Sequence, residues 1–217
     1  MRRLLLLSVG GLALLVLVLL VVAQLLLPGI AAQDIRSTLS RSGRVLEVKV
    51  SAFPAVELLW HQADRVVVHM ASYHSNPGHL GSLLEKAGDT GSLYASARVL
   101  DTGLLTLHNA TLTKSGNQLT GTGTVTEADL RSAVPFVQGV EPIASGDGQL
   151  VLRGTAFGVS ADATLRAVNG KLVVQPDVPI LNLVTVPVFS NPHLYVLGVA
   201  ARSVPGGFSF SGQARLQ

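Results

Sequence analysis

The stretch "SAFPAVELLWHQADRVVVHM", residues 51–70, changes its hydrophobic period twice. Leading into it, apolar side chains alternate with polar ones, which is the pattern of a half-buried strand; these apolar residues are Leu46, Val48, Val50 and Ala52. Phe53-Pro54 breaks the alternation, and a second strand pattern begins after Asp64. Between the two, Val56, Leu59 and Trp60 fall at i, i+3 and i+4, the spacing of one helix face. We therefore predict a short helical turn, carrying the chain's only tryptophan, between two strands.

The N-terminal residues indicate that the rest of the chain is exported. Arg2 and Arg3 precede a stretch without any charged residue, from Leu4 to Gln33. Its first part, through Ala23, is long enough as a helix to cross a hydrocarbon core about 30 Å thick. Two interpretations stay open: an uncleaved signal anchor, or a secretory signal peptide cut after Ala23. Because the basic residues precede the apolar run, both place the N-terminus in the cytoplasm and the domain outside.

The sequence is therefore divided into a leader, residues 1–27, and one exported domain, residues 28–217. Arg2 and Arg3 are two of the 16 basic side chains, so the remaining 14 nearly balance the 13 acidic ones. No run of Lys or Arg follows, and nucleic acid is not expected as a partner. The absence of cysteine excludes disulfides and thiol chemistry.

Short alternating segments joined by turn residues dominate the domain. Hairpin turns are predicted at residues 114–117, at Asn169-Gly170 and at residues 205–207. Together with a few helices, these strands predict an α+β fold: a long, curved antiparallel sheet wrapped around short helices.

Three helical features are predicted beyond the leader. Pro28 is expected to end or kink the hydrophobic helix, and a short amphipathic helix should follow, with Ile35 and Leu39 on one side. A second helix is predicted over residues 76–88, between Asn76-Pro77 and a terminal glycine. A third should begin after Thr126, which stands in capping-box spacing to Asp129.

The segment from Val178 to Ala201 contains no charged residue. Pro179, Pro187 and Pro192 rule out a membrane-spanning helix there. Two interpretations remain: a buried strand with flanking loops, or an apolar wall that faces an apolar ligand. With few aromatic residues in the chain, small and aliphatic side chains inside a strongly curved sheet are expected to leave a slot.

No catalytic or metal-binding pattern is found. The sequence has no G-x-S-x-G motif, and His69, His74 and His79 follow one another at intervals of five, which suits neither a helical metal pair nor one strand face. Capping a helix accounts for the neighbouring acids Glu127 and Asp129. We predict a protein that is not an enzyme and has no metal or cofactor.

Three stretches carry a resemblance to a known family: the strand that runs into "FP" and a short apolar helix before "DRVVVHM", the segment "GTGTVTEADLRSAVP", and the closing "LYVLGVAARSVPGGFSFSGQARL". Together they resemble the LmeA-like phospholipid-binding family of actinobacterial cell-envelope proteins, over most of the chain from about Pro28 onward. The resemblance implies an exported, membrane-associated protein that binds phospholipid in an elongated apolar cavity, similar to tubular lipid-binding domains.

The resemblance gives the short helical turn a role at the mouth of that cavity, with Val56, Leu59 and Trp60 facing inward. The alternative is a core plug in which Trp60 is simply packed. The predicted lipid-binding residues combine this turn with the uncharged segment: Phe53, Val56, Leu59, Trp60, Val178, Ile180, Leu181, Leu183, Val186, Val188 and Phe189.

The predicted function is to bind, and to shuttle, phospholipid at the outer face of the cytoplasmic membrane in support of envelope lipid or lipoglycan assembly. The ligand and the membrane are the expected partners, and the sequence names no protein partner. The alternative is a membrane-anchored scaffold whose sheet is fully packed and binds another envelope protein; an envelope hydrolase is a third, weaker candidate.

Overall fold

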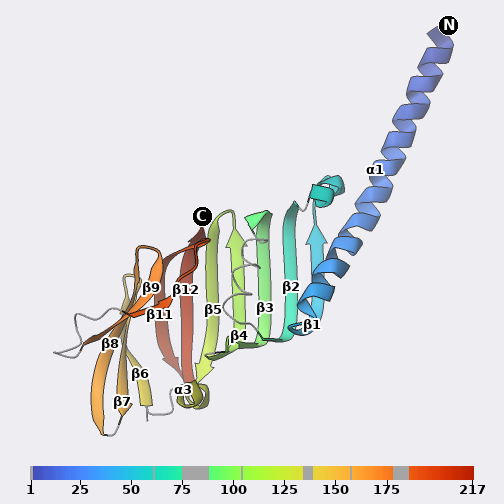
Figure 1. Cartoon of the computed structure of the whole chain (residues 1–217). Helices are drawn as coiled ribbons and strands as arrows, with labels where there is room; N and C mark the ends of the chain where they lie inside the picture. The colour runs from blue at the N-terminus through green and yellow to red at the C-terminus, as the bar shows by residue number, and fades with distance from the viewer. Residues whose placement is uncertain are drawn as a thin grey trace.

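The computed structural model describes residues 2–60, 62–74, 88–103, 105–133, 139–156, 158–177 and 186–217, with backbone alone for residues 2–17, Val56, Ala133, Ala156 and residues 186–189. The elements in chain order are α1 (Arg2–Leu39), β1 (Gly43–Ser51), the 3-10 helix η1 (Ala55–Trp60), β2 (Ala63–His74), β3 (Thr90–Asp101), β4 (Thr106–Ser115), β5 (Gln118–Thr126), α3 (Glu127–Ala133), β6 (Gly139–Gly146), β7 (Gln149–Ala156), β8 (Val159–Val168), β9 (Lys171–Asp177), β10 (Val186–Phe189), β11 (Leu194–Val204) and β12 (Gly207–Leu216). The predicted α+β class with a long wrapped sheet is confirmed (Figure 1).

The larger sheet has seven strands in the order β1-β2-β3-β4-β5-β12-β11. All neighbours are antiparallel except β2 and β3, which are parallel. The prediction of a purely antiparallel sheet is therefore wrong at this pair. Residues 75–89 connect the two strands, and a connection of that length can carry the chain back to the starting edge, as a parallel pair requires. The helix predicted over residues 76–88 falls almost entirely outside the described residues.

A second sheet has five strands in the order β10-β9-β8-β7-β6, so the predicted single sheet is in fact two. Its hairpin turns meet β11, the edge strand of the larger sheet: Val199 N donates to Gly148 O at 3.1 Å and Val196 N to Gly170 O at 2.9 Å. A side chain at Gly198 would lie 2.7 Å from the Gly148 Cα, so glycine is required at this contact. Edge strands expose unpaired backbone groups, and these turns satisfy part of the β11 edge.

The first helix is continuous through Pro28, where the sequence predicted an end or a kink. Proline removes one backbone hydrogen bond, but packing can offset that loss. The C-terminal part of α1 packs on the sheet through Ile35 and Leu39, in one hydrophobic cluster with Val66 and Val68 of β2. Figure 1 shows the N-terminal half of α1 extending beyond the sheets. The predicted apolar side of residues 31–43 is thus confirmed, as the end of a longer helix.

An irregularity in β1 corrects the predicted strand face. Val45 pairs with Met70 but Glu47 pairs with His69, so Leu46 is an extra residue opposite β2. Such a bulge reverses the alternation of side chains. Leu46 is accordingly exposed, and Val45 takes the inward position predicted for Leu46.

Local turn and cap signals are confirmed. Asn169 and Gly170 both have positive φ, as a type I′ hairpin requires, and they join β8 to β9. The amide of Asp129 donates to Thr126 Oγ1 at 3.2 Å, while Thr126 N donates to the Asp129 carboxylate at 3.3 Å, which is the reciprocal capping predicted for α3.

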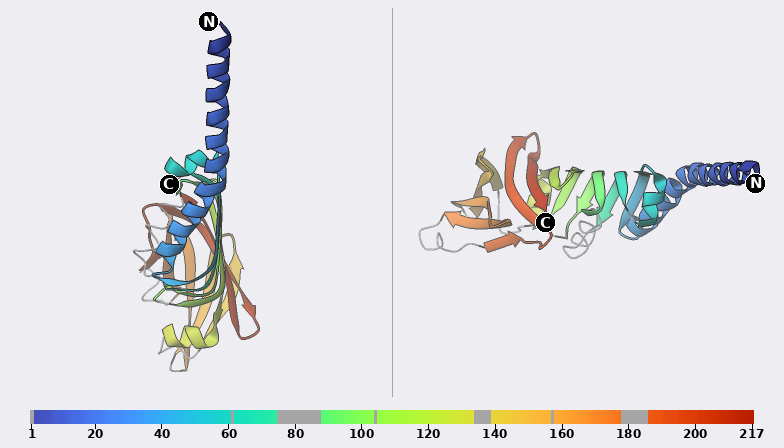
Figure 2. Two further views of the ribbon diagram at one scale, coloured as in Figure 1. Left: turned by 90° about the vertical axis from the view of Figure 1, so that its right-hand side faces the viewer. Right: turned by 90° about the horizontal axis from the view of Figure 1, so that it is seen from above.

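The two sheets form an elongated body whose strands bow in the end-on view (Figure 2).

Candidate functional site

One face of the seven-stranded sheet is apolar across its full width. Each residue of one row pairs directly with the next, from β1 to β11: Val48, Val68, Ala95, Leu112, Gly121, Gly212 and Val199. Side chains alternate between the two faces of a strand, so residues in one such row point to the same side. Charge and hydrogen-bonding side chains are absent from this row, which crosses six strand spacings of about 4.8 Å, or about 29 Å in all.

The opposite face is polar at the neighbouring positions. The row one residue away contains Glu47, His69, Ser96, Thr111, Thr122, Ser211 and Ala200. Several of these side chains bond one another: His69 Nδ1 lies 2.7 Å from Ser96 Oγ, and the hydroxyl oxygens of Thr111 and Thr122 are 2.7 Å apart. The sheet is therefore amphipathic, with one side suited to water and the other to hydrocarbon.

The middle of the apolar row carries little side-chain volume. Ala95, Gly121 and Gly212 are half-buried, as is Leu112 between them. A Cβ built on Gly121 meets nothing nearer than 3.8 Å, and one built on Gly212 nothing nearer than 3.9 Å. The two glycines are direct cross-strand partners, so the row carries no side chain above the backbone at β5 and β12. We call the seven-residue row, with these two glycines near its middle, the apolar trough.

A buried cation borders the trough. In the next row of the same face, Lys114 stands beside Leu93 and Leu119, and it is 2% exposed. Its ammonium group donates to the carbonyl oxygens of Gly88 and Thr90, and not into the trough. Burial lowers the pKa of Lys114. The side chain thus fastens the start of β3 while its aliphatic stem joins the apolar face.

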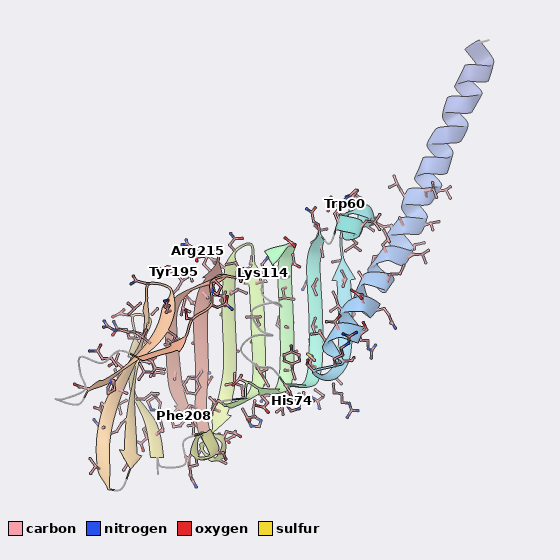
Figure 3. All side chains as sticks on the ribbon, viewed as in Figure 1. Trp60, His74, Lys114, Tyr195, Phe208 and Arg215 are labelled. Atoms are coloured by element: carbon pink, nitrogen blue, oxygen red, sulfur yellow. The ribbon has the colours of Figure 1, made fainter. Side chains whose placement is uncertain are left out.

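The sequence-predicted residues on and before η1 lie at one end of the sheet, beside α1 (Figure 3). Phe53 is 80%, Leu59 59% and Trp60 66% exposed, so packing of Trp60 as a core plug is contradicted. The buried side chain of this turn is Ala55, at 1% exposure. Val56 belongs to the turn, and its side chain lies outside the described part of the chain.

The second predicted group is not brought together with the first. Val178, Ile180, Leu181 and Leu183 fall outside the described residues; the backbone of Val186, Val188 and Phe189 forms β10. β10 is an edge of the five-stranded sheet, whereas η1 adjoins β1 at the far edge of the larger sheet. The two groups thus lie at opposite ends of an elongated body, and both remain predicted lipid contacts.

Two pockets among the described residues are lined in part by charged side chains. One of about 590 Å³ is lined at the end of α1 and the start of β1 by Arg36, Ser40, Arg41, Ser42, Gly43, Arg44, Val45, Ser72 and His74. Three guanidinium groups and no carboxylate line it, which suits an anionic group. The other pocket, of about 320 Å³, lies between α3, β6 and β11–β12. Its charged lining residues are Glu127, Glu141 and Arg131.

Two histidines of the sheet are each paired with an aspartate. His108 Nε2 lies 2.9 Å from the Asp129 carboxylate, whose pKa is lowered first by the hydroxyl of Thr126 and then by His108. His74 pairs with Asp101 at 3.3 Å, and the amide of Gly103 is the main cause of the lowered pKa of Asp101. Over the described residues no group of three His, Cys, Asp or Glu side chains could hold a metal ion.

Sequence reasoning missed the central positions of the trough. Gly121 and its partner Gly212 are distant in sequence, and only the strand register joins them. Lys114 was assigned to a turn. The alternation of apolar and polar residues shows which side chains share a face within one strand. It does not show which strands are neighbours, so the apolar row across the sheet could not be assembled from it.

Comparison with known proteins gives one match. The sequence profile of a family described as LmeA-like phospholipid-binding matches residues 21–183, about three quarters of the chain. No curated protein and no solved structure matches the chain.

Proposed function

The chain belongs to the LmeA-like phospholipid-binding family, and on that premise we propose that it holds the acyl chains of a phospholipid against the apolar trough. Family membership supports lipid binding, and the family is defined by binding and not by catalysis. The observation that carries the assignment of the site is the uninterrupted apolar row across seven strands, half-buried at its centre.

The dimensions of the trough suit acyl chains. A hydrocarbon core of about 30 Å holds two leaflets, so one extended chain spans about 15 Å. Val68 is buried against Leu39 of α1, so the open part of the row runs from Ala95 on β3 to Val199 on β11. Its four strand spacings, about 19 Å, offer room for the full length of a chain. The predicted contacts near η1 adjoin β1, whereas β10 belongs to the second sheet, beyond β11. We propose the first group as the mouth and the second as the distal wall of an elongated cavity.

Binding of this kind would support lipid transfer without covalent chemistry. Each methylene group exposed to water costs about 0.8 kcal/mol, so freeing a phospholipid with about 30 methylenes costs on the order of 20 kcal/mol. An apolar trough beside a membrane offsets most of that cost. We propose that the protein shuttles phospholipid and thereby supports envelope lipid or lipoglycan assembly.

We place the protein at the outer face of the cytoplasmic membrane. One apolar helix near the N-terminus is long enough to cross a bilayer, and such a helix is either a signal anchor or a signal sequence. Among the described residues, the part of α1 from Val18 to Leu39 is long and apolar enough to cross a bilayer, but Ile35 and Leu39 pack on the sheet. The anchor that we propose is therefore the earlier, uncharged part, Leu4 to Ala23, with Arg2 and Arg3 in the cytoplasm.

Native mass spectrometry of the full chain, released from detergent micelles, tests the proposed function. We expect one phospholipid to stay bound after activation has removed the loosely attached lipid and detergent. A bare chain, combined with failure to take up fluorescent phospholipid, would contradict the proposal. That outcome would favour the anchored scaffold with a fully packed sheet.

A further inference from the structure

The connection between β1 and η1 is tied to α1 by one side chain. The amide group of Gln24 makes two hydrogen bonds: its Nε2 donates to Ala52 O at 3.3 Å, and its Oε1 accepts from Ala55 N at 2.8 Å. Ala52 and Ala55 are both buried. The end of the sheet next to α1 is therefore fixed at the level of Gln24 along the helix.

Three large apolar side chains project from this fixed connection. Phe53, Leu59 and Trp60 are each more than half exposed, and we call them the apolar tip. The neighbouring turns of α1 are exposed in the same way, with Leu25 at 75% and Leu26 at 59%. Large apolar side chains gathered at one place on a surface mark a site of contact with a membrane or another protein.

Helix geometry sets the height of this patch relative to a bilayer. Residues Leu4 to Ala23 are uncharged, and twenty helical residues at about 1.5 Å each cover about 30 Å, the thickness of the hydrocarbon core. Gln24 is then the first residue past the core. Because Gln24 fixes the connection that carries the apolar tip, the tip lies at the boundary between acyl chains and headgroups.

We propose that Phe53, Leu59 and Trp60 insert into the outer-leaflet interface of the same bilayer that α1 spans. Tryptophan is enriched at this depth, where its ring is apolar and its N–H is hydrated. The inference rests on the proposed anchor. It gives the exposed tip an occupant, the lipid bilayer, and it holds one end of the seven-stranded sheet against the membrane surface.

The orientation that follows has a consequence for lipid entry. Trp60 stands at the end of the sheet next to the projecting part of α1, and His74, at the other end of β2, faces away from it (Figure 3). The tip therefore brings the η1 end of β1 and β2 next to the leaflet, and the first apolar side chains that a lipid leaving the leaflet meets are Phe53, Leu59 and Trp60.

Depth-dependent quenching in vesicles tests the proposal, because Trp60 is the only tryptophan. The full chain is reconstituted into vesicles of phosphatidylcholine and phosphatidylglycerol. The acyl chains carry bromine either near the headgroup (high) or near the terminal methyl group (low). We expect blue-shifted emission, protection from aqueous iodide, and several-fold stronger quenching by high than by low bromine. Free access of iodide without quenching by bromine would overturn the proposal, as would an emission that changes with protein dilution but not with bromine, which would indicate a second copy on the tip.

Matched variants separate insertion from folding. Phe53→Asp combined with Leu59→Asp should expose Trp60 to iodide, while Leu197→Asp, at an exposed leucine of β11, should leave the quenching unchanged. Gln24→Ala should weaken the preference for high bromine without removing the anchor. If the double variant quenches like the parent chain, the tip does not insert.

The experiment is independent of lipid binding in the trough. If Trp60 is quenched at shallow depth in a chain that retains no lipid, the result supports membrane insertion of the tip and contradicts lipid binding in the trough. If the chain retains a lipid but Trp60 is open to iodide, the result supports lipid binding and contradicts insertion. Equal quenching by high and low bromine would place Trp60 on an extracted lipid and would refute the interfacial depth.

Discussion

Filling the apolar trough should block phospholipid binding without harming the fold. Gly121→Leu adds four carbon atoms at its centre, where a Cβ would meet nothing nearer than the carbonyl oxygen of Thr111 at 3.8 Å. Its φ lies outside the left-handed region, so the backbone accepts a side chain. Glycine within a strand costs about 0.5–1 kcal/mol relative to alanine, and the substitution should therefore leave the free energy of unfolding unchanged or raise it slightly.

The magnitude follows from the volume that the new side chain occupies. Four carbon atoms displace about four acyl methylenes, each contributing about 0.8 kcal/mol, so about 3 kcal/mol of binding free energy is lost. This corresponds to a Kd raised about 200-fold. Retention of a fluorescent phospholipid by the full chain, titrated in detergent solution, measures the change, and thermal unfolding of the same samples reports stability.

A leucine introduced on the other face provides the control. Thr120 is exposed on β5 and belongs to the polar side, between Thr113 and Gln213. Thr120→Leu should leave lipid retention at the parental level. If Gly121→Leu binds lipid as well as the parent while its Tm is unchanged, or if both variants lose binding equally, acyl chains do not occupy the trough.

Three further predictions concern stability. Gly198→Ala places a Cβ 2.7 Å from the Gly148 Cα, so it should lower the Tm by costing about 1–3 kcal/mol in the contact between the two sheets. Gly139→Ala, whose Cβ meets nothing within 4 Å, should be nearly neutral. Equal Tm values for the two variants would show that the sheets do not dock through Gly198 and Gly148. Thr126→Ala should cost about 1 kcal/mol by removing the cap of α3, measurable by urea unfolding, and an unchanged midpoint would argue against the capping box. Burial lowers the pKa of Lys114 in the folded protein, so the unfolded state binds more protons and the free energy of unfolding should rise with pH between the folded pKa and the unfolded value of about 10.4. Urea titrations at neutral pH and at about pH 10 should show this rise in the parent and a smaller one in Lys114→Met, and identical slopes would assign the pH dependence to other groups.

Features set by neighbouring residues could be predicted from the sequence. The type I′ turn at Asn169-Gly170 and the cap of α3 at Thr126 depend on the conformations of two to four residues. The strands β1 and β2 around η1 were predictable for the same reason, since each follows its own alternation. The family resemblance, carried by apolar, glycine and proline positions, is confirmed over residues 21–183.

Features that depend on strand order could not be predicted. The parallel pairing of β2 with β3 and the docking of two hairpin turns on β11 join residues distant in sequence. The trough itself exists only because β5 pairs with β12, which places Gly121 opposite Gly212. Alternation within one strand indicates which residues share a face, but it gives no information about the neighbouring strand.

The exposure of Trp60 shows a different limit. The i, i+3, i+4 spacing assumed an α-helix, whereas η1 is a 3-10 helix with three residues per turn, so residues four apart no longer share a face. The turn also lies at the end of the sheet, where the buried position is taken by Ala55. Apolar spacing alone therefore could not distinguish a buried position from an exposed one.

Photocrosslinking with a phospholipid that carries a reactive group on its acyl chain tests the central claim most directly. The full chain is labelled in vesicles, and the modified residues are mapped by mass spectrometry. We expect crosslinks on the apolar face of β4, β5 and β12, at and around Leu112, Gly121 and Gly212, with the polar-face residues Thr111 and Thr122 unmodified. These strands lie several strand spacings from α1, so a lipid that remains in the bilayer around the anchor would not produce this pattern. Crosslinks confined to α1 and the apolar tip, with none on β4, β5 or β12, would contradict that claim.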